Sequence, residues 1–517
     1  MRALLIGSPY GGLLGTQHDV EAMRGMLQNH GFPVENITTL CNESATRENI
    51  LGAWRSLIGE TSSDDVLVIY YSGHGGLAQS DTGGESDPSR LQFIVPYDFD
   101  STLKTWQGIF DGELSQLLLE STTASHNVTY ILDCCHSARN GREVSGFSGR
   151  AKTLSLSRSD YSKLTRHFTQ LKEDGHIIAN NVTTNPFAVR IAAAAVLETA
   201  WECNEPGSDP MGVLTMQLTT TIAAAAGQLS WRGILLQVGA LVERTYPTLS
   251  QHPRSAGLDN RLPFSMVTKN ARQFLAKAKK NGIAILQAGR AHGIQEGDEF
   301  SVTPFGYREQ LETISTTMVV TQLRGFLAVL RVPPASTSVG LDADLDALAI
   351  LFRRQTRQPA RVQGAQDVLV ERLRSSLHLR TSEPNEDHPL VEFRQDGDTI
   401  SLHRFQGLQL GSERLGVDSV PTLVDRLVSN AEIFSQAQNL LSLESGTREE
   451  AFNVDVEFEF GLEVDGIKDA RGRFSETPAP QDEAISLVDN DRVYIHIRNH
   501  SHEKVFVNVL NIDAAGS

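Results

Sequence analysis

The sequence predicts an α/β protein whose N-terminal half is a mainly parallel sheet with helices on both faces. Short apolar runs at residues 3–7, 66–71 and 128–132 are typical of strands covered on both faces, which have no polar side. Amphipathic segments separate these runs along the chain. A regular alternation of strand and helix favours right-handed crossovers between parallel strands.

Turn and cap residues define the individual elements. Val20, Met23, Met26 and Leu27 have helical spacing, and Gly31 marks the end of that helix. The predicted order is strand, helix, strand, helix, strand, mobile loop, helix and strand, at residues 3–7, 19–30, 32–40, 46–58, 66–71, 77–92, 112–120 and 128–133.

Two of these strands end on chemically reactive side chains. The strand at 66–71 ends just before His74, and the strand at 128–132 ends just before Cys135. The carboxyl ends of parallel strands share one edge, where open α/β sheets bind their ligands. A thiol attacks as its thiolate, and a neighbouring imidazole can take the proton. The two side chains therefore predict a Cys-His dyad.

Composition excludes several other classes of protein. The net charge of -17 argues against binding to nucleic acid or to an anionic membrane. Four cysteines cannot form a disulfide framework for 517 residues, so a reducing compartment is expected. Three consecutive residues, Cys134, Cys135 and His136, cannot all face one tetrahedral zinc ion. Without a long apolar run or a signal segment, the chain is expected to be soluble and cytoplasmic.

The residues around the two strand ends resemble a known family. Tyr71-Ser-Gly-His-Gly75 and Asp133-Cys-Cys-His-Ser137 are similar to the histidine and cysteine signatures of the caspase and metacaspase cysteine peptidases. The separation of 61 residues between His74 and Cys135 is close to the roughly 50 of caspases. The metacaspase motif is usually Asp-Ser-Cys-His-Ser-Gly, so Cys135 matches the nucleophile and Cys134 the serine. Ala138 stands where glycine is usual.

The resemblance extends over about residues 1–265 and implies a mechanism. The thiolate of Cys135 attacks the scissile carbonyl, and His74 moves the proton. The backbone N–H groups of Gly75 and Cys135 are expected to bind the oxyanion. No third member of a triad is evident. Chemistry of this kind requires no cofactor.

The resemblance also implies the specificity of the site. Thr16, Asp19, Ser72 and Asp133 match the pocket of metacaspases, which cut after Arg or Lys, whereas caspases cut after Asp. Two carboxylates at one pocket pair a basic side chain through charge-assisted hydrogen bonds. Asp19 could equally serve as the N-cap of the helix that follows it.

Calcium is an expected activator, because many metacaspases bind it through carboxylates. The candidate ligands here are Asp98 and Asp111, with Asp100 and Glu113 nearby. Gly112 and Arg142 stand where further acidic residues are common in the family, so the predicted calcium site has lost ligands.

We expect three regions in the chain. Residues 1–265 form the caspase-like peptidase domain, in which the basic segment 139–186 is an exposed linker between a larger and a smaller part, often processed by the enzyme itself in this family. Residues 266–335 form a small β-rich module that includes a basic helix at 271–280, and residues 336–517 form an α+β region. Within the last region we predict helices at 367–377 and 420–443 and a hairpin at 391–403.

Two functions from different classes remain open. The first is a cysteine endopeptidase that cleaves proteins or peptides after Arg or Lys, processes itself in the linker and recruits partners through its C-terminal half. The second is a catalytically silent caspase-like scaffold or receptor. Intact His74, Cys135, Asp19 and Asp133 favour the endopeptidase, because a silent scaffold has no physical need of all four.

Overall fold

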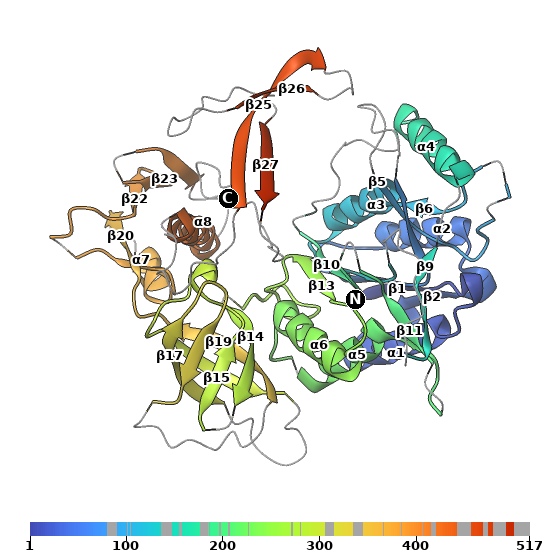
Figure 1. The fold of residues 1–517 in the computed structure, drawn as a ribbon, viewed down its shortest axis with the longest axis horizontal. Helices are drawn as coiled ribbons and strands as arrows, with labels where there is room; N and C mark the ends of the chain where they lie inside the picture. Colours follow the sequence, from blue (N-terminus) through green and yellow to red (C-terminus); the bar gives the residue numbers. More distant parts are fainter. Residues whose placement is uncertain are drawn as a thin grey trace. The chain divides into compact units, whose positions relative to one another are not determined.

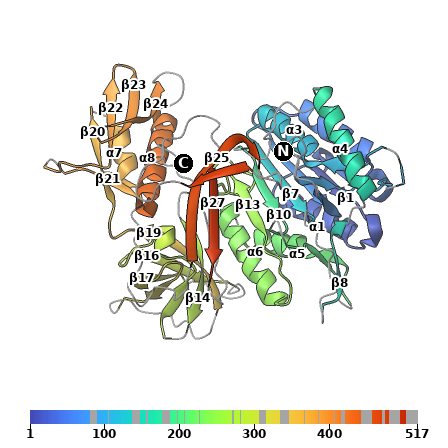
Figure 2. The ribbon, with the colours of Figure 1, turned by 45° about the horizontal axis from the view of Figure 1, so that its top comes forward.

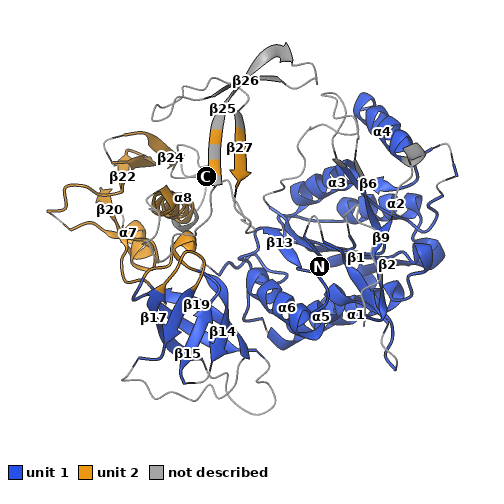
Figure 3. Cartoon of the chain, in the orientation of Figure 1, with its two compact units in different colours: residues 1–288, 296–322, 328–353 blue, residues 289–295, 323–327, 354–517 orange. Residues whose placement is uncertain are grey.

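The computed structural model divides the chain into two compact units (Figures 1 and 3). The first unit comprises residues 1–288, 296–322 and 328–353, and the second comprises 289–295, 323–327 and 354–517. The structure describes residues 1–79, 90–100, 102–103, 105–135, 147–154, 158–175, 185, 187–195, 198–204, 207–225, 227–269, 272–279, 281–305, 315–333, 345–364, 367–383, 385–405, 407–414, 420–441, 456–468, 474–478 and 493–500.

A six-stranded sheet forms the centre of the first unit, in the order β13-β10-β7-β3-β1-β2. Its strands are β1 (Arg2–Gly7), β2 (Ile37–Cys41), β3 (Val66–Ser72), β7 (Asn127–Asp133), β10 (Val189–Ala192) and β13 (Arg254–Gly257). All neighbours are parallel except β10 and β13. The predicted mainly parallel sheet is confirmed, although its second strand begins at Ile37 rather than at residue 32.

Helices cover both faces of this sheet (Figure 2). One face packs on α1 (Thr16–Asn29), α5 (Val213–Ala225) and α6 (Trp231–Thr245), and the other on α2 (Arg47–Gly59) and α3 (Asp111–Ala124). Side chains alternate along β1, with Ala3 and Leu5 in the first core and Leu4 and Ile6 in the second. Burial of each large aliphatic side chain contributes about 1.5–3 kcal/mol.

Two small sheets follow the carboxyl ends of the central strands. One has the order β6-β5-β4-β9 and the other β12-β11-β8. Their strands are β4 (Gly75–Gln79), β5 (Arg90–Ile94), β6 (Ile109–Phe110), β8 (Gly149–Ala151), β9 (Thr153–Leu154), β11 (Trp201–Cys203) and β12 (Met211–Gly212). The prediction of a loop at 77–92 is therefore wrong for the residues at both of its ends, which belong to the paired strands β4 and β5. Residues 80–89 lie outside the described part.

Within the linker predicted at 139–186, the described residues do not form an exposed, irregular segment. They form β8, β9 and helix α4 (Arg158–Glu173). On α4, Tyr161, Leu164, Phe168 and Leu171 follow each other at helical spacing and pack on an aromatic cluster that includes Phe93, Phe99, Trp106 and Phe110. The high density of basic residues hid this apolar stripe. Arg139 and Arg142 lie outside the described residues.

A closed barrel completes the first unit. Its strands, in the order β14-β15-β18-β17-β16-β19, are β14 (Gln273–Lys279), β15 (Ile283–Leu286), β16 (Glu299–Pro304), β17 (Thr316–Leu323), β18 (Ala328–Arg331) and β19 (Leu345–Arg353). The basic helix predicted at 271–280 is strand β14 instead. Ala276 and Ala278 are buried and Lys277 is exposed, which is the two-residue period of a strand.

The second unit contains a five-stranded sheet in the order β21-β20-β22-β23-β24, packed against two helices. These elements are β20 (Gln358–Gln363), α7 (Asp367–Arg374), β21 (Leu379–Thr381), β22 (Val391–Asp396), β23 (Thr399–Arg404), β24 (Gln409–Arg414) and α8 (Val420–Leu441). The predicted hairpin is confirmed, and it turns at Gly397 with φ of 58°. A further sheet joins β25 (Val456–Lys468), β26 (Phe474–Pro478) and β27 (Val493–Asn499).

Candidate active site

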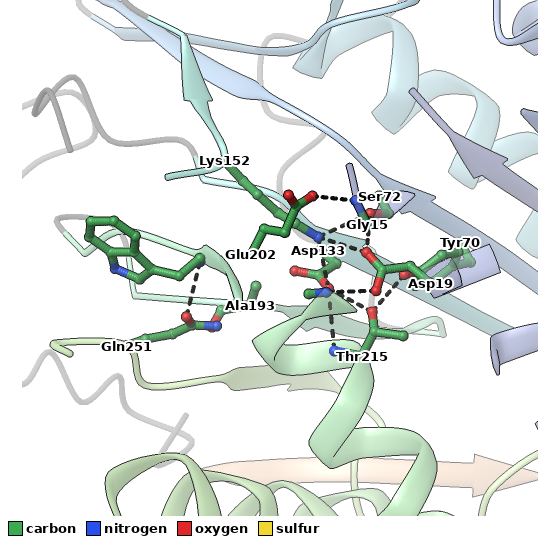
Figure 4. Close-up of polar contacts among 12 residues, drawn as sticks. Gly15, Asp19, Tyr70, Ser72, Asp133, Lys152, Ala193, Glu202, Thr215 and Gln251 are labelled. Atoms are coloured by element: carbon green, nitrogen blue, oxygen red, sulfur yellow. Dashed lines mark hydrogen bonds and ion pairs between the residues drawn. The ribbon is translucent and has the colours of Figure 1, made fainter. Parts of the chain in front are cut away.

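The structure brings three of the predicted pocket residues together around a lysine (Figure 4). Asp19 lies on the first turn of α1, and Ser72 and Asp133 end the neighbouring strands β3 and β7 in matching register. The Nζ atom of Lys152 lies 2.9 Å from Asp19 Oδ2, 3.1 Å from Asp133 Oδ2 and 3.0 Å from Ser72 Oγ. All four side chains are fully buried. Thr16, the fourth predicted residue, is also buried, and its carbonyl faces Gly7.

The end of strand β12 and the first turn of helix α5 supply further pocket contacts that the sequence did not reveal. The backbone N–H of Gly212 donates to Asp19 Oδ1 at 2.7 Å, and the hydroxyl of Thr215 donates to Asp133 Oδ2 at 2.6 Å. A Cβ atom at Gly212 would lie 2.1 Å from Asp133 Oδ2 and 2.4 Å from Lys152 Nζ. Glycine is therefore required there. The one visible signal was the Gly-X-X-Thr pattern at the start of this helix.

Charge complementarity holds Lys152 in this pocket. Burial alone would lower its pKa, yet Asp133 and Asp19 raise it above the ordinary value, so the ammonium stays charged. Burial raises the pKa of Asp133, opposed by the adjacent Lys152. A cation without these partners could not remain buried, and removing one partner of a buried ion pair typically costs about 3–5 kcal/mol.

A third buried carboxylate fixes the loop that leads into α1. Glu202 on β11 accepts hydrogen bonds from the backbone N–H of Gly15 at 2.7 Å and of Leu14 at 3.0 Å. The N–H groups at a helix N-terminus have no partner within the helix, so a carboxylate there both caps and stabilises it. Glu202 also helps to raise the pKa of Lys152.

The backbone on both sides of Lys152 is held by strand pairing and hydrogen bonds. On one side β8 pairs antiparallel with β11, and on the other β9 pairs parallel with β4. The Lys152 N–H donates to the carbonyl of Ala200 at 2.8 Å. The Lys152 carbonyl accepts two hydrogen bonds, from the N–H of Gly75 and the N–H of Cys135, each at 3.1 Å. These are the two N–H groups that the sequence predicted as oxyanion donors.

Both predicted dyad residues belong to the two segments that bind the Lys152 carbonyl. His74 directly precedes one of the two donors, Gly75, and Cys135 is the other donor. The thiol of Cys135 is buried and donates to the carbonyl of Glu198 at 2.9 Å. His74 is buried as well. Its burial, followed by the charges of Lys152 and Arg150, lowers its pKa to about 4, so the imidazole is neutral at physiological pH.

The neighbouring cysteine has a different environment. Cys134 belongs to the core on the α2 and α3 face of the sheet, whereas Cys135 belongs to the core on the opposite face. Burial raises the pKa of Cys134 well above its ordinary value, which keeps the thiol protonated. A packing role for Cys134 follows. His136 lies outside the described residues.

The residues predicted for calcium do not gather into one site. The carboxylate of Asp98 accepts from the N–H of Arg47 at 2.8 Å, and Glu113 is paired with the Arg47 guanidinium. Asp111 lines a cavity of about 300 Å³ together with Arg190. Among the residues that the structure describes, no group of three carboxylates, imidazoles or thiols could hold a metal ion. The described residues thus do not fit a calcium site, and activation by calcium stays a prediction.

Comparisons with known proteins agree with the predicted family. Residues 1–140 match the family model described as metacaspase, peptidase C14 domain. Metacaspase-2 of Trypanosoma brucei brucei is 26% identical over 279 residues, which are 52% of this chain and 76% of the relative. Metacaspase III c of Phaeodactylum tricornutum is 32% identical over 146 residues, or 26% of this chain and 42% of the relative. A crystal structure of caspase-1 from Spodoptera frugiperda has a TM-score of 0.32 at 13% identity and covers 50% of this chain and 87% of that chain.

The family match and the curated relatives support one class of protein. The N-terminal region of this chain is a caspase-like domain of a cysteine-type peptidase. Its first 140 residues match the metacaspase family model, and the curated relatives that it resembles are metacaspases. Proteins and peptides are accordingly its substrates. No helix in the described part of the chain is long and apolar enough to cross a membrane.

Proposed function

We propose that this protein is a cysteine endopeptidase that cleaves after Lys or Arg and processes itself between Lys152 and Thr153. One observation carries the proposal: the Lys152 side chain fills the acidic pocket while its carbonyl accepts hydrogen bonds from Gly75 and Cys135. A peptidase needs this double placement for the residue that precedes the scissile bond. The segment 149–154 is therefore the enzyme's own substrate, bound in an extended conformation.

The chemistry assigns one role to each group. Neutral His74 accepts the thiol proton of Cys135, and the thiolate attacks the carbonyl carbon of Lys152. The N–H groups of Gly75 and Cys135 stabilise the negative charge that develops on the carbonyl oxygen. The bond to the Thr153 nitrogen breaks as that nitrogen takes the proton from His74. Water, deprotonated by His74, then hydrolyses the thioester and restores the thiol.

The pocket explains why a basic residue should be selected. Asp19 and Asp133 approach one cation from two sides, and a hydroxyl supplies a further contact. An aspartate in the same place would bring a third carboxylate into a buried site, where like charges are strongly destabilising. Arginine retains the charge and can engage two carboxylates through its planar fork.

Fluorogenic peptides that differ only in the last residue test this specificity. With the self-processed enzyme, we expect peptides ending in Lys or Arg to exceed those ending in Asp or Gln by at least about 100-fold in kcat/KM, because the buried ion pair is lost. Each peptide is assayed with calcium and with a chelator, which also tests the calcium prediction. Equal hydrolysis of the Lys and Asp peptides would contradict the proposed specificity.

The low pKa of His74 makes a separate prediction about pH. Its neutral form exists above a pKa of about 4 and is lost as the pH falls through that value. Self-cleavage of freshly translated chain, shifted into buffers from pH 3.5 to 8, should therefore persist to about pH 4–5. For short peptides, kcat/KM reports the free enzyme, which lacks the charges of Lys152 and Arg150 near His74. Burial still lowers the pKa of His74 in the free enzyme, but without the two charges the acid limb should lie at a higher pH than for self-cleavage, and coincident limbs would refute this assignment.

A further inference from the structure

We propose that the site selects an extended sequence with glycine at the fourth and arginine at the third position before the scissile bond. The inference rests on the proposed cleavage between Lys152 and Thr153, which makes Gly149-Arg150-Ala151-Lys152 the bound sequence. Its substrates are thus polypeptides that carry the pattern glycine, arginine, small residue, lysine. The contacts of β8 with its neighbours carry the argument.

Glycine at the fourth position follows from a close backbone approach. Gly149 pairs with Cys203 of β11, and a Cβ atom built on it would lie 2.2 Å from the carbonyl oxygen of Glu202. Real Cβ contacts stay above about 3.0 Å, so any other residue must push the two strands apart. The same Cβ atom would also meet the ring of Phe147, but that side chain belongs to the segment itself and can move.

Strand β11 cannot retreat easily from a larger residue. Its other edge pairs with β12, where Cys203 lies opposite Met211. The Glu202 side chain is fully buried and accepts from Gly15 and Leu14, so shifting its backbone would strain the loop before α1. A substituted substrate would have to break this network or leave the strand pairing. Either change weakens binding along the whole extended segment.

Arginine at the third position is recognised by a backbone carbonyl. Successive side chains of a strand alternate, so Arg150 and Lys152 lie on the same side of the segment. The Arg150 guanidinium donates to the carbonyl of Gly12, a residue in the left-handed region with φ of 84°. A Cβ atom at Gly12 would lie 2.6 Å from Arg150 Nη1. Because Arg150 is exposed, this contact should be worth only a few-fold in rate.

The residue before Lys152 is expected to be small. Ala151 lies opposite Trp201 in the strand register and packs against the core cluster that contains it. A larger side chain there would meet close-packed aromatic and aliphatic groups.

Four peptides assayed with the self-processed enzyme test the selectivity. The reference is acetyl-Gly-Arg-Ala-Lys coupled to a fluorophore, and the others carry Ala at the fourth position, Gln at the third, or Asp at the last. We expect kcat/KM to fall at least about 10-fold for the Ala peptide and about 3-fold for the Gln peptide. Equal values for the first three peptides, with no hydrolysis of the Asp peptide, would overturn this inference alone. Failure to cleave any Lys peptide would overturn the proposed function.

The same inference is tested in the full chain by Gly149→Ala, with Ser148→Ala at the preceding, exposed position as the control, which removes only the hydrogen bond from the Ser148 hydroxyl to the carbonyl of Asn204. Self-cleavage of freshly translated Gly149→Ala should slow at least about 10-fold, whereas Ser148→Ala should match the wild type. Unchanged cleavage of Gly149→Ala would overturn the inference. Should this variant misfold, as thermal unfolding would reveal, the peptide series decides the outcome.

Discussion

Replacing Cys135 by alanine is expected to leave the 517-residue chain in one piece and to lower hydrolysis of Lys peptides at least about 1,000-fold. The change removes the nucleophile but keeps the backbone N–H that binds the Lys152 carbonyl. The bound segment and the acidic pocket should therefore survive. Gel electrophoresis of the purified chain and peptide kinetics measure the two effects.

Cys134→Ala is the matched control for this variant. The two cysteines are adjacent, but they lie in cores on opposite faces of the sheet. We expect Cys134→Ala to cleave itself and to retain peptide hydrolysis within a few-fold, with a loss of about 1 kcal/mol in stability from the small cavity. If Cys134→Ala were the inactive variant and Cys135→Ala the active one, the assignment of the nucleophile would be wrong.

Asp133→Asn is expected to lower kcat/KM for Lys peptides at least about 100-fold. The asparagine oxygen can still accept the hydrogen bond of Thr215, but the pocket loses one of the two charges that face the lysine ammonium. Losing one partner of a buried ion pair typically costs about 3–5 kcal/mol, which exceeds the cost of losing a hydrogen bond alone. Steady-state kinetics is measured with Lys and Gln peptides. Loss of charge recognition lowers kcat/KM for the Lys peptide alone, whereas a general loss of active enzyme lowers it for both peptides.

The control is Asp65→Asn, which makes the same chemical change directly before β3, at the amino ends of the parallel strands, whereas Asp133 lies at their carboxyl ends. Asp65 has a pKa of about 2, lowered chiefly by the Ser62 N–H, and also pairs with the N-terminus. Its substitution should cost some stability at neutral pH but leave peptide hydrolysis unchanged. Equal effects of the two substitutions, or an Asp133→Asn variant that keeps its preference for Lys over Gln, would contradict the proposed pocket.

Local sequence patterns predicted β1, β3 and β7 of the central sheet because each of these strands carries its own apolar run. The apolar runs of β3 and β7 are continuous, and each ends directly before the residues that form the site. Since parallel strands share one edge, the positions of His74 and Cys135 on that edge could be inferred without any knowledge of contacts. The carboxylates of Asp19 and Asp133 required the family resemblance in addition, because an acidic residue near a helix start is ambiguous.

Lys152 could not be predicted in the same way. It lies in a basic, weakly apolar segment, and such a composition usually indicates solvent exposure. Its burial depends on Asp19, which is 133 residues away, and on Asp133. The prediction of a helix at β14 was wrong for a related reason. The lysines of this segment suggested the exposed surface of a helix, although the alternation of Ala276 and Ala278 with Lys277 indicates a strand. In both cases the observed structure depends on partners that local sequence patterns do not reveal: the carboxylates of Asp19 and Asp133 for Lys152, and the neighbouring strands β15 and β19 for β14.

The most direct measurement is the N-terminal sequence of the fragments that the purified wild-type chain produces. The proposal predicts a new N-terminus at Thr153, the same cut in Lys152→Arg, and no cut at this position in Lys152→Gln or Cys135→Ala. The arginine variant retains the charge that Asp19 and Asp133 bind, and the glutamine variant keeps much of the size without it. A fragment beginning at Thr153 in the glutamine or alanine variant, or a wild-type chain that cuts itself only elsewhere, would contradict the account.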